Sequence, residues 1–226
     1  MRLTLSGPAG PLEAILDEPK PSPTLMNFGL ATSNFDIGGR GPRAAVVFAH
    51  PLPTHHGTMH TKAVYQGAKG LVHIGCPVLR FNFRGVGMSG GTFDAGPGEM
   101  DDFRAALDYM HARYPSAPLW AAGFSFGAWI ALETGAADPR VSALIGVAPP
   151  VTREHYAFTN TLASAKPKFF VQGDLDDLCP LKDLRAFYAK LKEPKELVVV
   201  DGANHLFEGK TGEVGEALED LLGDVE

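Results

Sequence analysis

Short apolar runs alternate with segments of helical period along most of this chain. The apolar runs predict strands at Ala44–Ala49, Pro77–Phe83, Leu119–Phe124, Val141–Val147, Lys168–Gln172 and Glu196–Val200. The helical period predicts helices at about Met59–His73, Glu99–Arg113, Phe126–Ala136, Lys182–Lys192 and Val214–Leu222. Apolar strands without polar alternation are typical of parallel sheets that helices cover on both faces. We therefore expect an α/β fold with a mostly parallel, doubly wound sheet.

The chain before the first apolar run has a different pattern. Arg2–Leu5 and Leu12–Leu16 flank a turn rich in Gly and Pro and alternate in polarity, which predicts an antiparallel hairpin. Residues 19–42 are rich in Pro, Gly, Asn and Ser and show no period, so we expect an irregular segment on the surface. A chain of 226 residues can bury a full core, and we expect one domain over residues 1–226.

The charge balance narrows the classes of partner. The chain has 20 Lys and Arg against 26 Asp and Glu, a formal charge of −6, and no basic stripe, which argues against nucleic acid. Gly and Pro interrupt the first residues, and no apolar stretch approaches the length of a membrane span, so we expect no membrane association. Cys76 and Cys179 form neither a CxxC pair nor a zinc-ligand cluster. We therefore expect a cytoplasmic protein with reduced cysteines, and its oligomeric state stays open.

The clearest chemical motif lies where a predicted strand meets a predicted helix. The sequence GFSFG at residues 123–127 joins the strand Leu119–Phe124 to the helix Phe126–Ala136. A nucleophile elbow needs small flanking residues, because its turn is sharp and holds the serine hydroxyl above the sheet. The alternative is that Ser125 only caps the helix. The position of the motif at a strand end favours a nucleophile.

A serine nucleophile needs a histidine base and a carboxylate that orients the base. The predicted strand Lys168–Gln172 is followed by three aspartates: Asp174, Asp176 and Asp177. The last predicted strand is followed by His205. Because the carboxyl ends of parallel strands meet at one edge of a sheet, we expect Ser125, His205 and one of these aspartates to lie together. The spacing alone leaves the choice of aspartate open.

Attack on a carbonyl also needs N–H donors for the oxyanion that forms. The residue after an elbow nucleophile supplies one donor, which here is the backbone N–H of Phe126. The second donor comes from the loop after the first parallel strand. In that loop Pro51 and Pro53 have no N–H, so we expect the second donor to be Leu52.

Two other motifs resemble binding sites that we do not expect here. Residues 85–90 match the glycine pattern of dinucleotide-binding loops, but residues 91–97 cannot open the helix that such a loop requires. A group of histidines follows the first parallel strand without an accompanying carboxylate or cysteine: His50, His55, His56 and His60. We interpret them as a polar loop at the rim of the pocket. We expect no cofactor and no bound metal.

The segment between Val147 and Lys168 has only about twenty residues. It is too short for a large lid domain, so we expect an open site that suits esters of short or medium acyl groups. Three aromatic residues are candidates for an acyl pocket and are equally readable as core: Tyr156, Phe158 and Phe207.

From Ala44 to Phe207 the chain resembles the α/β-hydrolase family. Besides the elbow, residues 84–89 (RGVGMS) are similar to the family's arginine-glycine-x-glycine-x-serine turn, and residues 202–207 (GANHLF) are similar to its histidine turn. Residues 173–180 (GDLDDLCP) are similar to its acid loop, and this resemblance selects Asp176. The combination of motifs is most similar to a small, single-domain bacterial subgroup of serine esterases related to the dienelactone hydrolases.

The resemblance implies a serine hydrolase that cleaves a small-molecule carboxylic ester with Ser125, His205 and Asp176 as catalytic residues. Two departures limit what it implies. The dienelactone hydrolases have cysteine at the position of Ser125, so their lactone chemistry is not carried over, and the subgroup usually has histidine at the position of Leu52. A thioesterase and an amide or peptide hydrolase would use the same triad. A ligand-binding protein that keeps the fold without catalysis is an alternative of another class, and the presence of all three residues argues against it.

Overall fold

The computed structural model describes residues 1–20 and 41–224. Its strands form one eight-stranded sheet in the order β1-β2-β4-β3-β5-β6-β7-β8. The strands are β1 Arg2–Gly7, β2 Gly10–Asp17, β3 Ala45–Ala49, β4 Val78–Phe81, β5 Leu119–Phe124, β6 Val141–Val147, β7 Lys168–Gly173 and β8 Lys195–Val200. The expected irregular segment falls mostly on residues 21–40, which lie outside the described residues.

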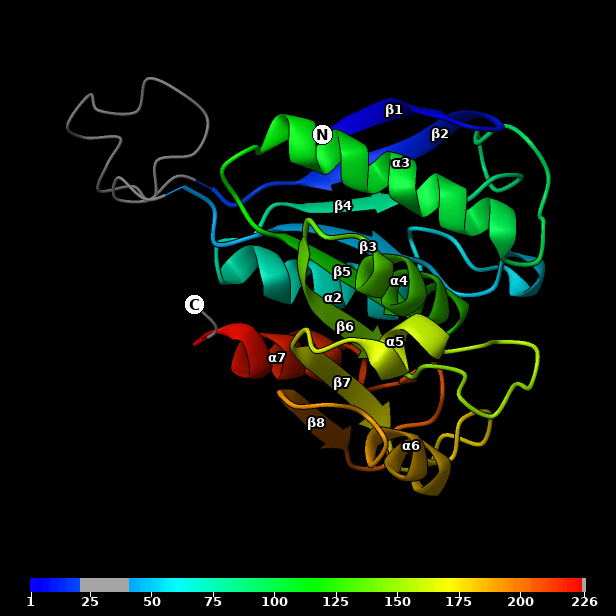
Figure 1. Cartoon of the computed structure of the whole chain (residues 1–226), viewed down its shortest axis with the longest axis vertical. Helices are drawn as coiled ribbons and strands as arrows, with labels where there is room; N and C mark the ends of the chain where they lie inside the picture. The colour runs from blue at the N-terminus through cyan, green and yellow to red at the C-terminus, as the bar shows by residue number, and fades with distance from the viewer. Residues whose placement is uncertain (21–40, 225–226) are drawn as a thin grey trace.

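The sheet is mostly parallel, as predicted, and the hydrophobic pattern explains where it is not. Every residue of β3 and β5 is buried, because helices cover both faces of these central strands. In β2 buried Leu12, Ala14 and Leu16 alternate with partly exposed residues. This strand pairs antiparallel with β1 and with β4 and so places the predicted hairpin at one edge of the sheet (Figure 1).

Helices pack on both faces of the sheet and form two hydrophobic clusters. One cluster packs α3, α4 and α6 on one face, and the other packs α2 and α7 on the opposite face. In Figure 1, α3 and α4 lie in front of the sheet and α2 lies behind it. The helices are α2 Lys62–His73, α3 Pro97–Arg113, α4 Phe126–Ala137, α5 Thr159–Ala163, α6 Leu181–Tyr188 and α7 Thr211–Leu222. The predicted helices are all present, with ends that differ by a few residues.

The short helix α5 is the one α-helix of the described residues that the pattern did not predict. The buried carboxylate of Glu133, on α4, accepts hydrogen bonds from the backbone N–H groups of Asn160 and Thr161 and from the Thr161 hydroxyl. A distant side chain therefore caps a segment that is too short to show a period. Apart from α5, the connection between β6 and β7 is irregular, and within residues 1–20 and 41–224 no large lid covers the sheet.

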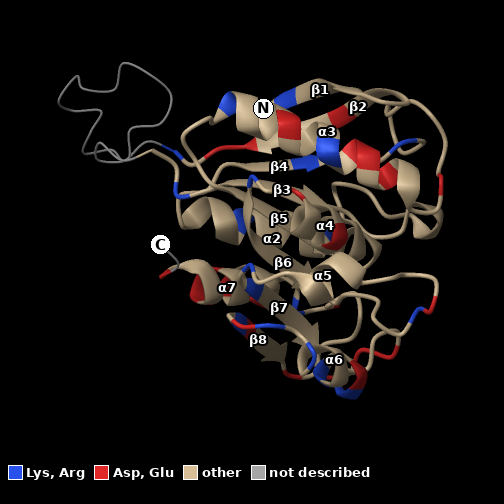
Figure 2. Ribbon diagram, viewed as in Figure 1, with Lys and Arg blue, Asp and Glu red and all other residues tan. Residues whose placement is uncertain are grey.

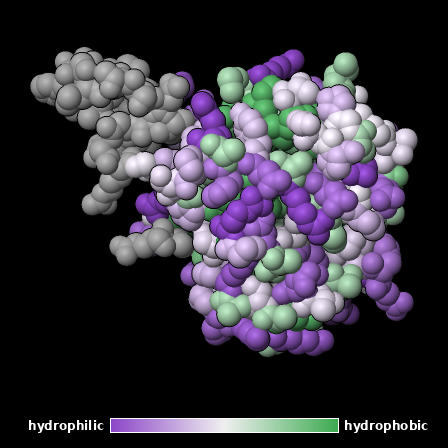
Figure 3. All heavy atoms as spheres, turned by 45° about the horizontal axis from the view of Figure 1, so that its top comes forward, coloured by the Kyte–Doolittle hydropathy of each residue, from purple (hydrophilic) through white to green (hydrophobic). Residues whose placement is uncertain are grey.

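Charged residues of both signs lie over the outer surface of the helices, as Figure 2 shows for α3 and α6, whereas most of the central sheet is tan. In the view of Figure 3 the described surface is largely hydrophilic or neutral, with small hydrophobic areas between. Within residues 1–20 and 41–224, no helix combines the length and the apolar character that crossing a membrane requires.

Candidate active site

Ser125 occupies a strained turn between β5 and α4. Its φ of 54° and ψ of −121° are angles that residues other than glycine rarely adopt. The flanking glycines allow the turn: a Cβ on Gly123 would lie 2.0 Å from the Gly127 carbonyl oxygen, and a Cβ on Gly127 would lie 2.4 Å from the His50 carbonyl oxygen. The Ser125 side chain makes no capping hydrogen bond to α4, so the helix-cap alternative does not hold.

The structure brings Ser125, His205 and Asp176 together. The distance between His205 Nε2 and Ser125 Oγ is 2.9 Å, and the distance between His205 Nδ1 and Asp176 Oδ2 is 2.8 Å. Both His205 and Asp176 are buried, with exposed fractions of 7% and 3%. A carboxylate can only accept, so Nδ1–H donates to Asp176 and leaves Nε2 as the acceptor for the serine proton.

Asp176 is the aspartate of the acid loop that reaches the histidine. Its Oδ1 accepts the backbone N–H groups of Leu178 and Cys179 at 2.9 and 2.8 Å, so the turn folds back on its own side chain. Asp174 and Asp177 make no hydrogen bond to His205. These contacts hold the carboxylate within hydrogen-bonding distance of the imidazole.

Gln172 is a residue of the site that the sequence analysis missed. It is fully buried near the end of β7, and its Nε2 donates to Asp176 Oδ2 at 2.8 Å and to the Cys179 carbonyl at 2.7 Å. The available signal was a polar residue at the end of an apolar strand that precedes the acid loop. The two bonds tie the acid loop to the sheet.

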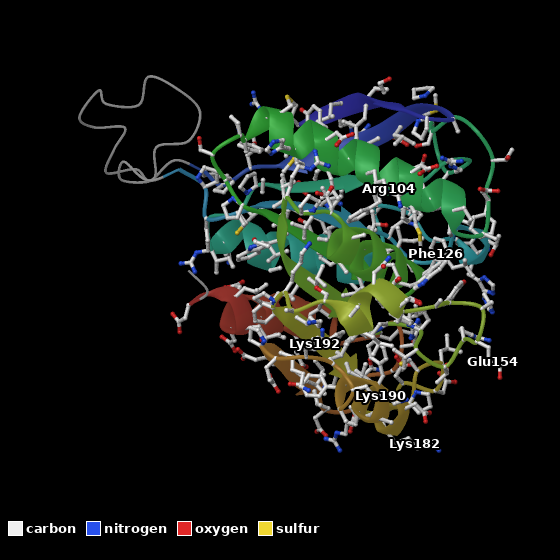
Figure 4. All side chains as sticks on the ribbon, in the orientation of Figure 1. Arg104, Phe126, Glu154, Lys182, Lys190 and Lys192 are labelled. Carbon is white, nitrogen blue, oxygen red and sulfur yellow. The ribbon has the colours of Figure 1, made fainter. Side chains whose placement is uncertain are left out.

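Neither of the two expected oxyanion donors has a hydrogen-bond acceptor within the described part of the chain. The N–H of Phe126 opens α4 at its first turn, and neither it nor the N–H of Leu52 donates to another described residue. The contact between Gly127 and the carbonyls of Ala49 and His50 brings the loop after β3 against the start of α4. Figure 4 labels Phe126 where α4 begins, on the side of the sheet to which the parallel strands point.

His50 differs from the other histidines of its loop. His55, His56 and His60 are exposed, whereas His50 is fully buried, so the interpretation of the group as a polar rim is wrong for His50. Burial lowers the pKa of His50 to about 4 and keeps it neutral at neutral pH. In the part of the chain that the structure describes, no three His, Cys, Asp or Glu side chains are arranged to hold a metal ion.

Of the three aromatic candidates, Tyr156 lies beside the elbow. Its ring stacks on Trp129 at 4.3 Å between centroids and meets the edge of Phe126 at 5.8 Å. It is half-buried, and burial raises the pKa of its phenol. Phe158 and Phe207 are core residues with exposed fractions of 7% and 0%.

The glycine-rich residues 85–90 form a turn that packs on the N-terminal hairpin. The Gly90 N–H donates to the Pro11 carbonyl at 2.7 Å, and a Cβ on Gly90 would lie 3.1 Å from the Gly10 Cα. The next helix, α3, begins only at Pro97. Close packing between two loops therefore accounts for glycine at this point of the pattern.

Known proteins resemble this chain over most of its length. Residues 40–166 match the family model described as serine aminopeptidase, S33. An uncharacterised protein of Rickettsia prowazekii is 38% identical over 189 residues, which are 80% of this chain and 79% of the relative. The structure of an α-β serine hydrolase homologue from Coxiella burnetii matches with a TM-score of 0.84 at 36% identity, over 98% of this chain and 97% of the other. A Xanthomonas campestris protein, described as an α/β serine hydrolase without a lid, matches with a TM-score of 0.84 at 34% identity, over 98% and 93% of the two chains.

Proposed function

The chain belongs to the α/β serine hydrolases described by the serine aminopeptidase S33 model, and from this premise we propose that it hydrolyses carboxylic esters of short to medium acyl groups at Ser125. The observation that carries the proposal is the chain of two hydrogen bonds from Ser125 through His205 to Asp176. A buried carboxylate and an imidazole in this order are what a serine needs to become a nucleophile at neutral pH.

In the proposed reaction Ser125 Oγ attacks the ester carbonyl while His205 Nε2 takes the serine proton. Asp176 holds the imidazole in the required tautomer and stabilises its cation. The N–H groups of Phe126 and Leu52 stabilise the oxyanion of the tetrahedral intermediate. His205 returns the proton to the leaving alkoxide, and a water molecule activated by the same imidazole then hydrolyses the acyl-enzyme.

The family model favours a second candidate function, the hydrolysis of an amide bond at the N-terminus of a peptide. The same three side chains would serve an ester, a thioester or an amide, because these substrates differ in the leaving group and share the acyl-enzyme. The connection between β6 and β7 contains only the five-residue helix α5, which supports an open site and small acyl groups.

The proposal is tested with a fluorophosphonate probe and a substrate panel on the wild-type chain and on Ser125→Ala. We expect labelling and turnover in the wild type, and in the variant no labelling and a kcat lower by about 10⁴-fold or more. The panel holds p-nitrophenyl esters of increasing acyl length, acyl-CoA thioesters and aminoacyl anilides. A folded wild type that takes up no probe and cleaves nothing would instead indicate a ligand-binding protein. Faster cleavage of anilides than of esters would favour the peptidase.

A further inference from the structure

His50 is a buried titratable residue to which the proposed mechanism gives no role. It directly follows β3 and is shielded completely from solvent. Its Nε2 lies 3.1 Å from the backbone nitrogen of Phe83, and its Nδ1 lies 2.7 Å from the carbonyl oxygen of Pro51. A backbone N–H can only donate, so Nε2 is the acceptor and the ring proton is on Nδ1. His50 therefore donates a hydrogen bond to Pro51.

The Pro51 carbonyl and the Leu52 N–H belong to the same peptide group. Among the described residues the only cis peptide bond is Glu193–Pro194, so the Pro51–Leu52 bond is trans. In a planar trans peptide the C=O and the N–H point in opposite directions. The bond from His50 therefore turns the Leu52 N–H away from the buried imidazole.

Other contacts hold the same stretch of backbone. A Cβ on Gly57 would lie 2.1 Å from the Pro51 carbonyl oxygen, so Gly57 packs directly on that peptide group. The Leu52 carbonyl accepts the N–H groups of His55 and Gly57, each at 3.1 Å. The carbonyls of Pro51 and Leu52 thus both accept hydrogen bonds, whereas the Leu52 N–H donates to no described residue.

We propose that His50 is a positioning residue that aims the Leu52 N–H at the oxyanion by holding the Pro51–Leu52 peptide group. The inference rests on the proposed function, because it needs Leu52 to be an oxyanion donor. Phe83, which anchors the other ring nitrogen, belongs to the segment after β4. His50 thus couples the loops after two neighbouring strands to one donor of the site.

Two variants separate the two hydrogen bonds of the imidazole. Asparagine at position 50 places an amide nitrogen near the site of Nδ1, and His50→Asn can still donate to Pro51. Glutamine reaches the site of Nε2 with an acceptor oxygen, and His50→Gln can hold Phe83 but has no donor near Pro51. We expect kcat of His50→Asn within several-fold of wild type. We expect His50→Gln to lose about 10 to 100-fold in kcat with little change in KM, part of the effect of losing an oxyanion donor.

A double-variant cycle tests whether His50 acts through Leu52. Leu52→Pro deletes the N–H, and in that background we expect His50→Gln to have no further effect on kcat. Equal kcat values for folded Asn and Gln variants, or an undiminished Gln effect in the Leu52→Pro background, overturn the proposal. If the Gln variant does not fold by circular dichroism, the Asn variant decides: a folded His50→Asn that has lost kcat overturns it, and one that keeps kcat supports it. Absence of turnover in the wild type on every substrate of the panel would instead contradict the proposed function.

Discussion

Replacing Leu52 by proline removes one hydrogen-bond donor and leaves most of the local backbone as it is. Leu52 has a φ of −51° and a ψ of 120°, and proline holds φ near −65°. The residue after it, Pro53, already requires an extended conformation at position 52. Leu52→Pro also keeps the carbonyl that accepts the N–H groups of His55 and Gly57. The change therefore acts mainly on the N–H.

The expected loss follows from what an oxyanion donor contributes. Removing one such donor raises the barrier of acyl transfer by about 3 to 4 kcal/mol, or about 100 to 1,000-fold in kcat. The leucine side chain is half-buried against the hydrophobic cluster that also contains Phe126, and Leu52→Ala removes these contacts while it keeps the N–H. We expect Leu52→Ala to lower the free energy of unfolding by about 1 kcal/mol and to leave kcat close to that of the wild type.

The assay is kcat and KM on the best p-nitrophenyl ester for the wild type, Leu52→Ala and Leu52→Pro, with thermal unfolding of each. A drop confined to kcat of the proline variant, at a melting temperature near that of the alanine variant, is the expected result. A well-folded Leu52→Pro with the turnover of Leu52→Ala would refute the assignment of Leu52 as a donor.

Three further predictions concern single side chains. Asp176→Asn lowers kcat by about 10⁴-fold because the imidazole loses its orienting acceptor, whereas the exposed Asp177→Asn keeps wild-type turnover; near-normal activity of the first variant contradicts the assignment. The ordinary pKa of histidine is 6.5, whereas the pKa of His50 in the folded protein is about 4. As the pH falls, the imidazole of His50 is therefore protonated in the unfolded chain before it is protonated in the folded protein. The stabilisation that neutral His50 contributes is fully present above pH 6.5 and falls by about 3 kcal/mol as the pH drops to about 4. The free energy of unfolding in urea, measured across this range, should therefore depend less on pH in His50→Asn than in the wild type. Thr134→Val raises the free energy of unfolding by about 1 kcal/mol, measured in urea, because the buried Thr134 hydroxyl has no hydrogen-bond partner among the described residues; a less stable variant would show that the hydroxyl is satisfied.

The parts of the fold that follow from short-range pattern could be predicted. Fully buried strands such as β3 and β5 appear as continuous apolar runs, and the alternating β2 appears as part of the antiparallel hairpin at one edge of the sheet. The rule that parallel strands end at one edge then brings Ser125 and His205 together, although they are eighty positions apart. Pattern and topology together thus locate the candidate site.

The parts that depend on distant contacts could not be predicted from the residues. The choice of Asp176 depends on a turn in which Leu178 and Cys179 donate back to its side chain, and three aspartates fit the spacing equally. The buried His50 accepts the backbone N–H of Phe83, thirty-three positions along the chain. A histidine in a loop with exposed neighbours gives no sign of such a contact.

The backbone conformation of Ser125 lowers the stability of the fold at the residue that carries the proposed nucleophile. A left-handed residue other than glycine raises the energy of the native state by about 1 kcal/mol or more, and here that residue carries the hydroxyl. Directed evolution for heat resistance alone would consequently favour glycine at this turn and yield a sturdier but inert protein. Any engineering of this scaffold needs activity in its selection from the first round.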